Sequence, residues 1–210
     1  MGTETRIIKD KSKVNKIINI RPNNLKAKLL YYLPEDFYYD RNQYKDPEIC
    51  MNCLQFKKCF ECPHDNFLGQ ELAFDIDPEN IPCSCKSTYP NFCDRCMKEA
   101  IHNAILLGDY LKQYFHLIRF VYSGRGCHVH VLDKSAFKLS IDEREALNKE
   151  LQQFNIDPWV SRGHIRLIRA PYSLNALVSR VVMPLSTKEI TTFNPLTNNK
   201  TIPLFMRQEV

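Results

Sequence analysis

The 210-residue sequence predicts a mixed α/β (α+β) fold, and three observations indicate this class. Apolar runs of strand length alternate along the chain with segments of helical periodicity. Two irregular stretches rich in cysteine interrupt that alternation. The composition is typical of a globular protein, because hydrophobic residues make up 44% and aromatic residues 11% of the chain.

The expected elements follow from spacing and capping signals. Leucines at helical spacing predict a helix over 23–33, which Pro34 ends. Ser140 and Glu143 form a capping box that opens a helix reaching about Phe154. The other expected elements are a helix over 96–115, strands over 71–77, 117–124 and 128–133 and within 164–173 and 181–185, irregular stretches over 45–68 and 78–95, and a turn-like tail over 192–200.

Charge and targeting signals narrow the class of protein. The formal net charge of +5 is compatible with a nucleic-acid partner, although it is equally common on ordinary protein surfaces. No apolar run approaches the length of a membrane span, and the first ten residues lack a hydrophobic signal region. The sequence therefore predicts a soluble intracellular protein with no membrane partner.

Two aspartates end the apolar run ELAFDID. Residues at i and i+2 of a strand point to the same face, about 6.6 Å apart, so Asp75 and Asp77 are expected side by side. Phe74 and Ile76 would face the core. A divalent cation would relieve the repulsion between the two carboxylates. On these residues alone, the short and common pattern favours a turn that starts at Asp77, with Asp75 solvated.

The stretch YSGRGCHVHVLD predicts a phosphate-binding turn between two strands. The four residues of the turn are Ser123, Gly124, Arg125 and Gly126. Glycines let backbone amides approach a phosphate closely, and the arginine would add a charged contact. His128 and His130 share one face of the following strand. The alternative is a plain hairpin with two solvated histidines.

Eight of the nine cysteines fall into two compact clusters, which indicates metal rather than disulfides in a chain without a secretion signal. One cluster predicts a tetrahedral zinc site, formed by Cys83, Cys85, Cys93 and Cys96. The other predicts a second zinc site with His64 as a spare ligand, formed by Cys50, Cys53, Cys59 and Cys62. For it, an iron-sulfur cluster or exchange of cysteine pairs between the clusters remains open. The ninth cysteine, Cys127, is expected to be a small packed residue.

Four motifs occur in a fixed order: ELAFDID, the cysteine knuckle, SGRGCHVHV, and NIDPWVSRGHIRLIRAPYSLN. This order, over about residues 70–185, resembles the archaeo-eukaryotic primase superfamily of small catalytic primase subunits and primase-polymerases. The resemblance implies a catalytic core with an RRM-like mixed sheet, helices packed on it and inserted zinc-binding loops. It implies one catalytic domain over 1–210, with a cysteine-rich insertion at 45–68 and a zinc knuckle at 78–96.

The resemblance also implies roles for individual residues. Asp75, Asp77 and Asp157 would hold two catalytic Mg2+ or Mn2+ ions. The nucleotide triphosphate would be bound by Ser123, Gly124, Arg125, Gly126, His128 and Arg169. Strand alternation puts Arg166 on the face opposite Arg169, so it is expected at template phosphate or on the surface. We also expect Arg41 on the surface rather than at the nucleotide, and Trp159 in the core rather than stacked on a base. The sequence departs from the family after APYSLN, where ALVSR replaces a basic, glycine-containing turn.

The implied function is template-dependent nucleotide transfer by a primase or primase-polymerase, using Mg2+ or Mn2+ for catalysis and Zn2+ for structure. Implied partners are a single-stranded DNA template, ribonucleoside or deoxyribonucleoside triphosphates, and a large primase subunit or accessory domain. The expected location is the cytoplasm or nucleoid, or the nucleus in a eukaryote. Two alternatives remain: a repair polymerase that only extends primers, and a zinc-stabilised nucleic-acid-binding module without catalysis.

Overall fold

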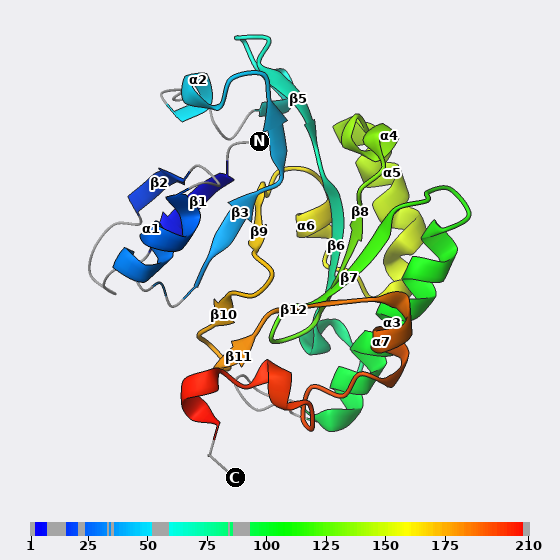
Figure 1. The fold of residues 1–210 in the computed structure, drawn as a ribbon. Coiled ribbons are helices and arrows are strands. Elements are labelled where there is room, and N and C mark those ends of the chain that lie inside the picture. The colour runs from blue at the N-terminus through cyan, green and yellow to red at the C-terminus, as the bar shows by residue number, and fades with distance from the viewer. Residues whose placement is uncertain are drawn as a thin grey trace.

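A computed structural model describes residues 3–7, 16–20, 24–32, 34, 36–51, 59–83, 85 and 93–207. Its centre is a four-stranded antiparallel sheet with the strand order β12–β7–β8–β6 (Figure 1). The strands are β6 (Leu72–Ile76), β7 (Ile118–Tyr122), β8 (Cys127–Val131) and β12 (Met183–Leu185). The fold is therefore of the mixed α+β class that the sequence predicts.

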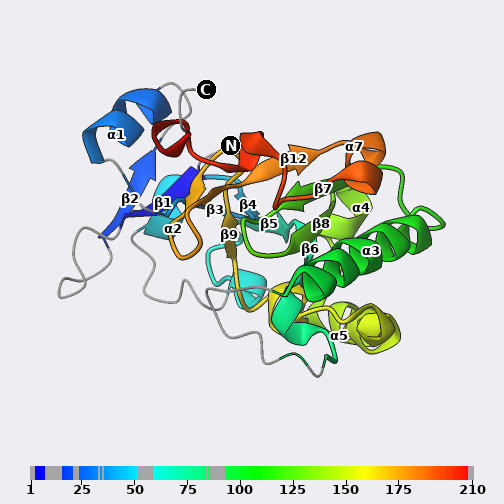
Figure 2. The same cartoon turned by 90° about the horizontal axis from the view of Figure 1, so that it is seen from below.

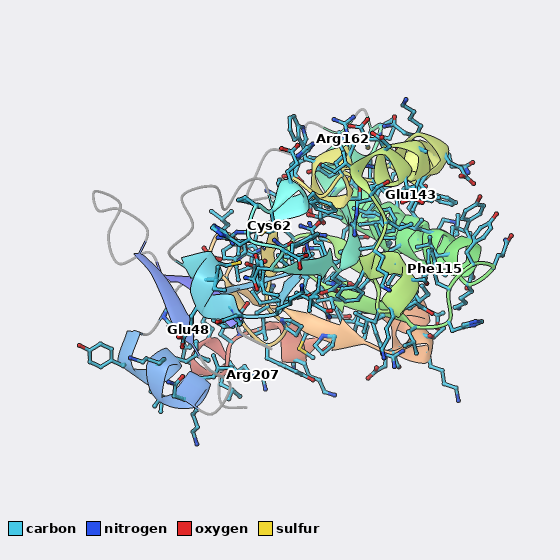
Figure 3. All side chains as sticks on the ribbon, turned by 90° about the horizontal axis from the view of Figure 1, so that it is seen from above. Glu48, Cys62, Phe115, Glu143, Arg162 and Arg207 are labelled. Atoms are coloured by element: carbon cyan, nitrogen blue, oxygen red, sulfur yellow. The ribbon has the colours of Figure 1, made fainter. Side chains whose placement is uncertain are left out.

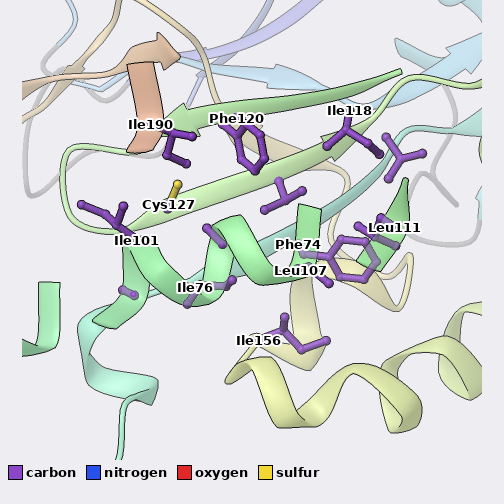
Figure 4. Close-up of a cluster of buried hydrophobic side chains, with 14 of the residues drawn as sticks. Phe74, Ile76, Ile101, Leu107, Leu111, Ile118, Phe120, Cys127, Ile156 and Ile190 are labelled. Atoms are coloured by element: carbon purple, nitrogen blue, oxygen red, sulfur yellow. The ribbon is translucent and has the colours of Figure 1, made fainter. Parts of the chain in front are cut away.

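The long helix α3 (Asp94–Leu111) packs on one face of this sheet and forms the core with it (Figures 2 and 4). Period-two alternation in β6 sends Phe74 and Ile76 into that core, where both are fully buried. Gly108 lets α3 approach the sheet closely, because a Cβ there would lie 2.4 Å from the Phe120 ring. The apolar stripe of α3 consists of Met97, Ala100, Ile101, Ala104, Leu107 and Leu111.

Short strand pairs lie on the side of the main sheet that faces away from α3 (Figures 1 and 2). Each pair is antiparallel: β3 (Tyr38–Asp40) with β9 (Leu167–Arg169), β4 (Asn42–Tyr44) with β5 (Phe67–Gln70), and β10 (Leu174–Asn175) with β11 (Arg180–Val181). An isolated bridge joins Asp36 to Asn175. These pairs put polar residues opposite the strand face of β6 and β8 that does not enter the core.

The remaining elements surround this arrangement. The antiparallel strands β1 (Thr3–Ile7) and β2 (Lys16–Ile20) contact β3 through β1. The other helices are α1 (Leu25–Tyr32), α2 (Pro47–Met51), α4 (Lys134–Phe137), α5 (Ile141–Leu151), α6 (Pro158–Ser161) and α7 (Thr187–Thr192). Short 3-10 turns are η2 (Cys59–Glu61), η3 (Pro78–Asn80), η4 (Gln152–Phe154), η5 (Asn199–Thr201) and η6 (Leu204–Met206). Within the described ranges, no helix combines the length and apolar character that crossing a membrane requires.

Most expected elements are confirmed with small shifts at their ends. Ser140 and Glu143 form the predicted capping box, with the Ser140 N–H donating to the Glu143 carboxylate at 2.7 Å. The stretch expected to be irregular over 45–68 contains α2 and the first two residues of β5, which continues to Gln70. There Gly69 has φ +147°, and a Cβ would lie 2.4 Å from the Phe137 carbonyl oxygen. Polar residues such as Gln70 are buried in β5, so the usual alternation is hidden.

Two expectations about arginines are wrong. Arg41 is 2% exposed rather than on the surface, and its guanidinium donates to the backbone carbonyls of Glu71 at 3.2 Å, Val160 at 2.6 Å and Ile165. These carbonyls accept from both terminal nitrogens of the buried guanidinium and tie Val160 and Ile165 to the rest of the fold, whereas its Nε has no hydrogen-bond partner among the described residues. Arg166 is neither exposed nor free for a template, because its side chain is 12% exposed and pairs with Asp40 at 3.1 Å.

Candidate active site

Asp75 and Asp77 lie where β6 leaves the core. Asp75 projects from the strand face opposite Phe74 and Ile76, and its side chain is 19% exposed. Its Oδ1 atom is buried and has no hydrogen-bond partner among the described residues. Burial, followed by the charges of Asp77 and Asp157, raises the pKa of Asp75 well above its usual value. The fold therefore holds a carboxylate in a place where its charge is poorly compensated.

Asp157 lies beside this pair although it is far away in the sequence. Its backbone N–H donates to the Asp75 carbonyl oxygen at 2.7 Å, which joins the start of α6 to the edge of β6. Its carboxylate accepts the Trp159 N–H at 2.9 Å and caps α6. The structure thus brings together the three acids that the sequence selects.

The three carboxylates do not form a compact set of ligand atoms. Across the described ranges, only the four cysteines of the knuckle place three or more ligand atoms within 4.8 Å of one another. The Asp77 carboxylate pairs with Arg125, and that of Asp157 caps a helix. The donor set is still of the type that Mg2+ and Mn2+ prefer, and the unpartnered Asp75 Oδ1 fits a cation. A cation would compete with Arg125 for Asp77.

The glycine turn packs directly against Asp77. The Ser123 hydroxyl accepts the Gly126 N–H at 2.8 Å and holds the turn closed. A Cβ on Gly126 would lie 2.3 Å from Asp77 Oδ1, so only glycine permits this approach. Gly124 has φ +89°, and a Cβ there would lie 2.6 Å from the Asn175 Cβ. The predicted turn therefore forms and lies against the predicted acidic strand end.

Arg125 links the turn to the acids. Its guanidinium pairs with Asp77 and, at 3.2 Å, with Glu79. The side chain is 30% exposed, so it can reach solvent as well as the carboxylates. Arg125 is therefore positioned to bind a further anion that enters the site.

His128 faces Asp75 across the β6–β8 pair. The two residues are opposite in register, and His128 Nε2 lies 3.6 Å from Asp75 Oδ1. Burial, then the positive charges of its neighbours, lowers the pKa of His128 well below its usual value. These effects favour the neutral form of the imidazole. Its Nδ1 atom is buried and has no hydrogen-bond partner among the residues described.

A second buried histidine supports the first, and sequence analysis missed its partners. His130 Nδ1 lies 2.5 Å from Glu71 Oε1, and Tyr39 donates to the other Glu71 oxygen at 2.9 Å. The rings of His128 and His130 meet edge to face, with centroids 5.6 Å apart. Burial opposes ionisation of Glu71, but the His130 contacts lower its pKa overall. The available signal was the alternation that places both histidines on one strand face.

Arg169 lies on strand β9, near enough to His128 for its charge to affect that histidine. In the β3–β9 pair Arg169 is opposite Tyr38, whose hydroxyl accepts from its guanidinium at 2.8 Å. Arg169 also pairs with Asp36 and stacks over the Tyr38 ring at 4.8 Å. Its charge contributes to the lowered pKa of His128. Arg169 is therefore one of the charged residues that influence His128.

The four cysteines of the knuckle meet at the start of α3, as the spacing predicts. Cys93 is the N-cap residue of α3 and Cys96 is buried in its first turn. The sulfur atoms of Cys85 and Cys96 are 3.1 Å apart. Four thiols this close could hold a zinc ion. Cys127 is 1% exposed and packs in the core, as expected (Figure 4).

The first cysteine cluster stays a prediction. Cys53 lies outside the described residues. Asn66 donates to the Cys50 sulfur at 3.1 Å. The Tyr44 hydroxyl lies 3.7 Å from the Cys59 sulfur. Cys62 follows η2 directly.

Comparison with known proteins identifies the family. No family model matches the chain. An uncharacterised DNA primase small subunit-like protein of Archaeoglobus fulgidus is 44% identical over 188 residues, which cover 85% of this chain and 66% of that protein. The DNA primase small subunit PriS of Pyrobaculum calidifontis is 26% identical over 213 residues, covering 79% of this chain and 64% of the relative. The chain belongs to the archaeo-eukaryotic primase superfamily.

The chain spans about two thirds of the length of these two relatives. PriS of Thermococcus kodakarensis is 38% identical over 88 residues, which are 40% of this chain and 25% of that protein. Among solved structures, the polymerase domain of Mycobacterium tuberculosis Ligase D in complex with DNA matches with a TM-score of 0.49 and 15% identity, over 90% of this chain and 64% of that one.

In this chain of the primase superfamily, the side chains of the candidate active site come from segments far apart in the sequence. The expectation that Trp159 lies in the core is wrong, because its side chain is 59% exposed. Trp159 lies in the one-turn helix α6, of which Asp157 is the N-cap residue. A helix of one turn is too short to be buried on both faces. Sequence composition gave no signal that the only tryptophan would face solvent.

Proposed function

We propose that the protein is a primase-type nucleotidyltransferase that joins nucleoside triphosphates on a single-stranded DNA template. The observation that carries this proposal is the contact between the glycine turn and the acidic strand end. Gly126 packs on Asp77 so closely that a Cβ would lie 2.3 Å from its carboxylate. His128 faces Asp75 next to it. A triphosphate bound by the turn would therefore lie beside the carboxylates.

In this proposal Asp75, Asp77 and Asp157 hold two Mg2+ or Mn2+ ions. When bound, such ions lower the pKa of an attacking 3′-hydroxyl and stabilise the charge that develops on the triphosphate and its leaving group. The protein's own part is to bring three acids from two separate segments to one place. It also keeps Asp75 Oδ1 without a hydrogen bond and therefore available to a cation.

The phosphates are positioned by groups around the turn. Backbone N–H groups of the turn and the Ser123 hydroxyl donate to phosphate oxygens. Neutral His128 donates one ring N–H, and Arg169 provides a charge from the facing strand pair. Arg125 has two roles: without nucleotide it neutralises Asp77, and with nucleotide it moves to a phosphate oxygen and leaves Asp77 to the cation.

Zinc in the knuckle would fix the loop that joins β6 to α3. Four thiolates complete a tetrahedral site and leave no open position, so this ion is structural. A second zinc at the first cysteine cluster, and a large primase subunit or accessory domain as partner, belong to the same proposal on the basis of the family alone.

The test is synthesis on a single-stranded DNA template with Mn2+ or Mg2+, in separate reactions with and without primer and with ribonucleotides or deoxyribonucleotides. Asp75→Ala and Asp77→Ala should each abolish product while the protein stays folded. Asp109→Ala is a matched control, because Asp109 is exposed on α3 and pairs with Lys112 on the surface. If either active-site variant kept full template-dependent synthesis, the assignment would be refuted.

The same reactions separate the alternatives. Product only in the presence of primer would favour a primer-extending repair polymerase. No product under any condition, together with DNA binding that needs no divalent cation, would favour a non-catalytic binding module.

A further inference from the structure

An exposed aromatic side chain lies two residues from Asp157. Trp159 is 59% exposed, and its backbone N–H donates to the Asp157 carboxylate at 2.9 Å. Asp157 in turn donates its N–H to the Asp75 carbonyl oxygen at 2.7 Å. Two hydrogen bonds therefore fix the backbone of Trp159 relative to β6, although its indole ring faces solvent.

Arg162 lies over this ring from the end of the same helix. Its guanidinium carbon is 5.9 Å from the indole centroid, which is within cation–π distance. Its Nε atom is buried without a hydrogen-bond partner, and in the described part of the chain no carboxylate pairs with Arg162. Arg162 lies toward the outer edge of the molecule, near α5, when the structure is viewed from above (Figure 3). An arginine so placed can bind an incoming anion.

The segment that carries Trp159 and Arg162 is basic and partly apolar. Residues 158–188 contain no aspartate or glutamate. Two and three residues after Arg162, His164 is exposed and Ile165 is 40% exposed. An apolar protein partner would require a wider patch of exposed apolar side chains, whereas a ring beside unpaired positive charge suits a base and its phosphate.

We propose that Trp159 and Arg162 form a stacking platform for single-stranded nucleic acid, with one base on the indole ring and the adjacent phosphate on the guanidinium. This proposal rests on the proposed function in one respect, because it identifies the strand with the template. Stacking of a base on an aromatic side chain contributes roughly 5- to 100-fold in affinity. The phosphate contact makes binding depend on salt concentration.

Trp159 is the only tryptophan, so the intrinsic indole fluorescence of the chain reports on this side chain alone. The experiment titrates zinc-loaded protein with a thymidine oligonucleotide, without nucleotides or divalent cations, so that binding is measured apart from synthesis. We expect saturable quenching. A nucleoside triphosphate titrated in its place should leave the fluorescence unchanged, because its site is the glycine turn. If the triphosphate alone quenched equally, the strand assignment would be wrong.

Variants then link the signal to affinity, measured by anisotropy of a labelled oligonucleotide. Trp159→Ala should weaken binding roughly 5- to 100-fold, and Trp159→Phe should weaken it less, because a smaller ring still stacks. Arg162→Gln should weaken binding and lower the slope of log affinity against log salt by about 0.7. Tyr114→Ala is the matched control, because Tyr114 is 62% exposed beyond the end of α3 and should not matter.

Unchanged affinity in folded Trp159→Ala, or DNA binding without quenching in the unsubstituted protein, would overturn the platform. Thermal unfolding of each variant shows that it is folded. Loss of synthesis in Asp75→Ala with intact quenching would support the platform and the catalytic site separately. Quenching in a protein that never synthesises would keep the platform and refute the proposed function.

Discussion

Replacing Asp75 by asparagine should remove activity and stabilise the protein in the absence of divalent cations. Asp75 is a buried charge whose Oδ1 has no hydrogen bond, and the charges of Asp77 and Asp157 add to its cost. Burial, followed by these charges, raises the pKa of this carboxyl, so ionising it costs more free energy in the folded state than in the unfolded state. Asparagine has nearly the same shape and no charge.

The size of the gain follows from the burial of the side chain. An unsatisfied buried polar group costs about 1–3 kcal/mol, and more when it is charged. Because Asp75 is still 19% exposed, water screens part of this cost, and we expect a gain of about 1–2 kcal/mol. For a chain of this size that corresponds to a rise of roughly 2–8 °C in the unfolding temperature.

The assay is thermal unfolding in buffer without added Mg2+ or Mn2+, followed by the same measurement with Mn2+. Asp77→Asn is the comparison, because Asp77 pairs with Arg125 and its replacement should gain less than about 0.5 kcal/mol. Added Mn2+ should raise the unfolding temperature of the unsubstituted protein more than that of Asp75→Asn, because only the former offers the full carboxylate set. A destabilised Asp75→Asn variant, or an equal response to Mn2+, would refute the reasoning.

Three further predictions concern the turn, the knuckle and the buried histidine. Gly126→Ala should cost about 1–3 kcal/mol of unfolding free energy and raise the KM for nucleotide, because the new Cβ would lie 2.3 Å from the carboxylate of Asp77. Denaturant unfolding measures the first effect and steady-state kinetics the second, and an unchanged KM would contradict the prediction. Cys83→Ser should remove one zinc per chain by elemental analysis and lower stability, and equal zinc content would contradict the knuckle site. Glu71→Ala should cost about 3–5 kcal/mol, because it leaves buried His130 without its partner. Because the pKa of Glu71 is lowered on folding, its contribution is present above the unfolded value of about 4.3 and is lost as the pH falls through the folded value; unfolding temperatures between pH 7 and 3 should fall less steeply in Glu71→Gln than in the unsubstituted protein.

The elements that the sequence predicts well are those in which one face is apolar throughout. Strand β6 shows this, because Phe74 and Ile76 alternate with polar residues and are fully buried. The stripe on α3 is equally regular. The glycine turn was recognisable as a turn because glycines between two apolar strands are a strong signal for a hairpin connection, whereas its approach to Asp77 depends on a contact that no local pattern encodes.

The contacts that the sequence did not predict depend on partners far along the chain. Arg41 is buried because carbonyl groups 119 and 124 residues away accept its hydrogen bonds, and no local pattern encodes such acceptors. His130 finds Glu71 across 59 residues for the same reason. Trp159 was expected in the core because tryptophan is usually buried, but a one-turn helix at the sheet edge leaves it exposed.

The pairing of Arg125 with Asp77 could be foreseen only in part. Sequence spacing puts both near one end of the sheet, but each was assigned to a different ligand. In the structure they neutralise each other. If the proposed function holds, nucleotide and cation should bind together, since each would take one member of the pair.

Calorimetric titration with a nucleoside triphosphate, with and without Mn2+, tests this site most directly. We predict that measurable affinity requires Mn2+ and disappears in Asp75→Asn and Asp77→Asn, because these carboxylates would hold the ion whose charge offsets that of the phosphates. Equal affinity without the cation, or in either variant, would show that the acids and the glycine turn do not form one nucleotide site.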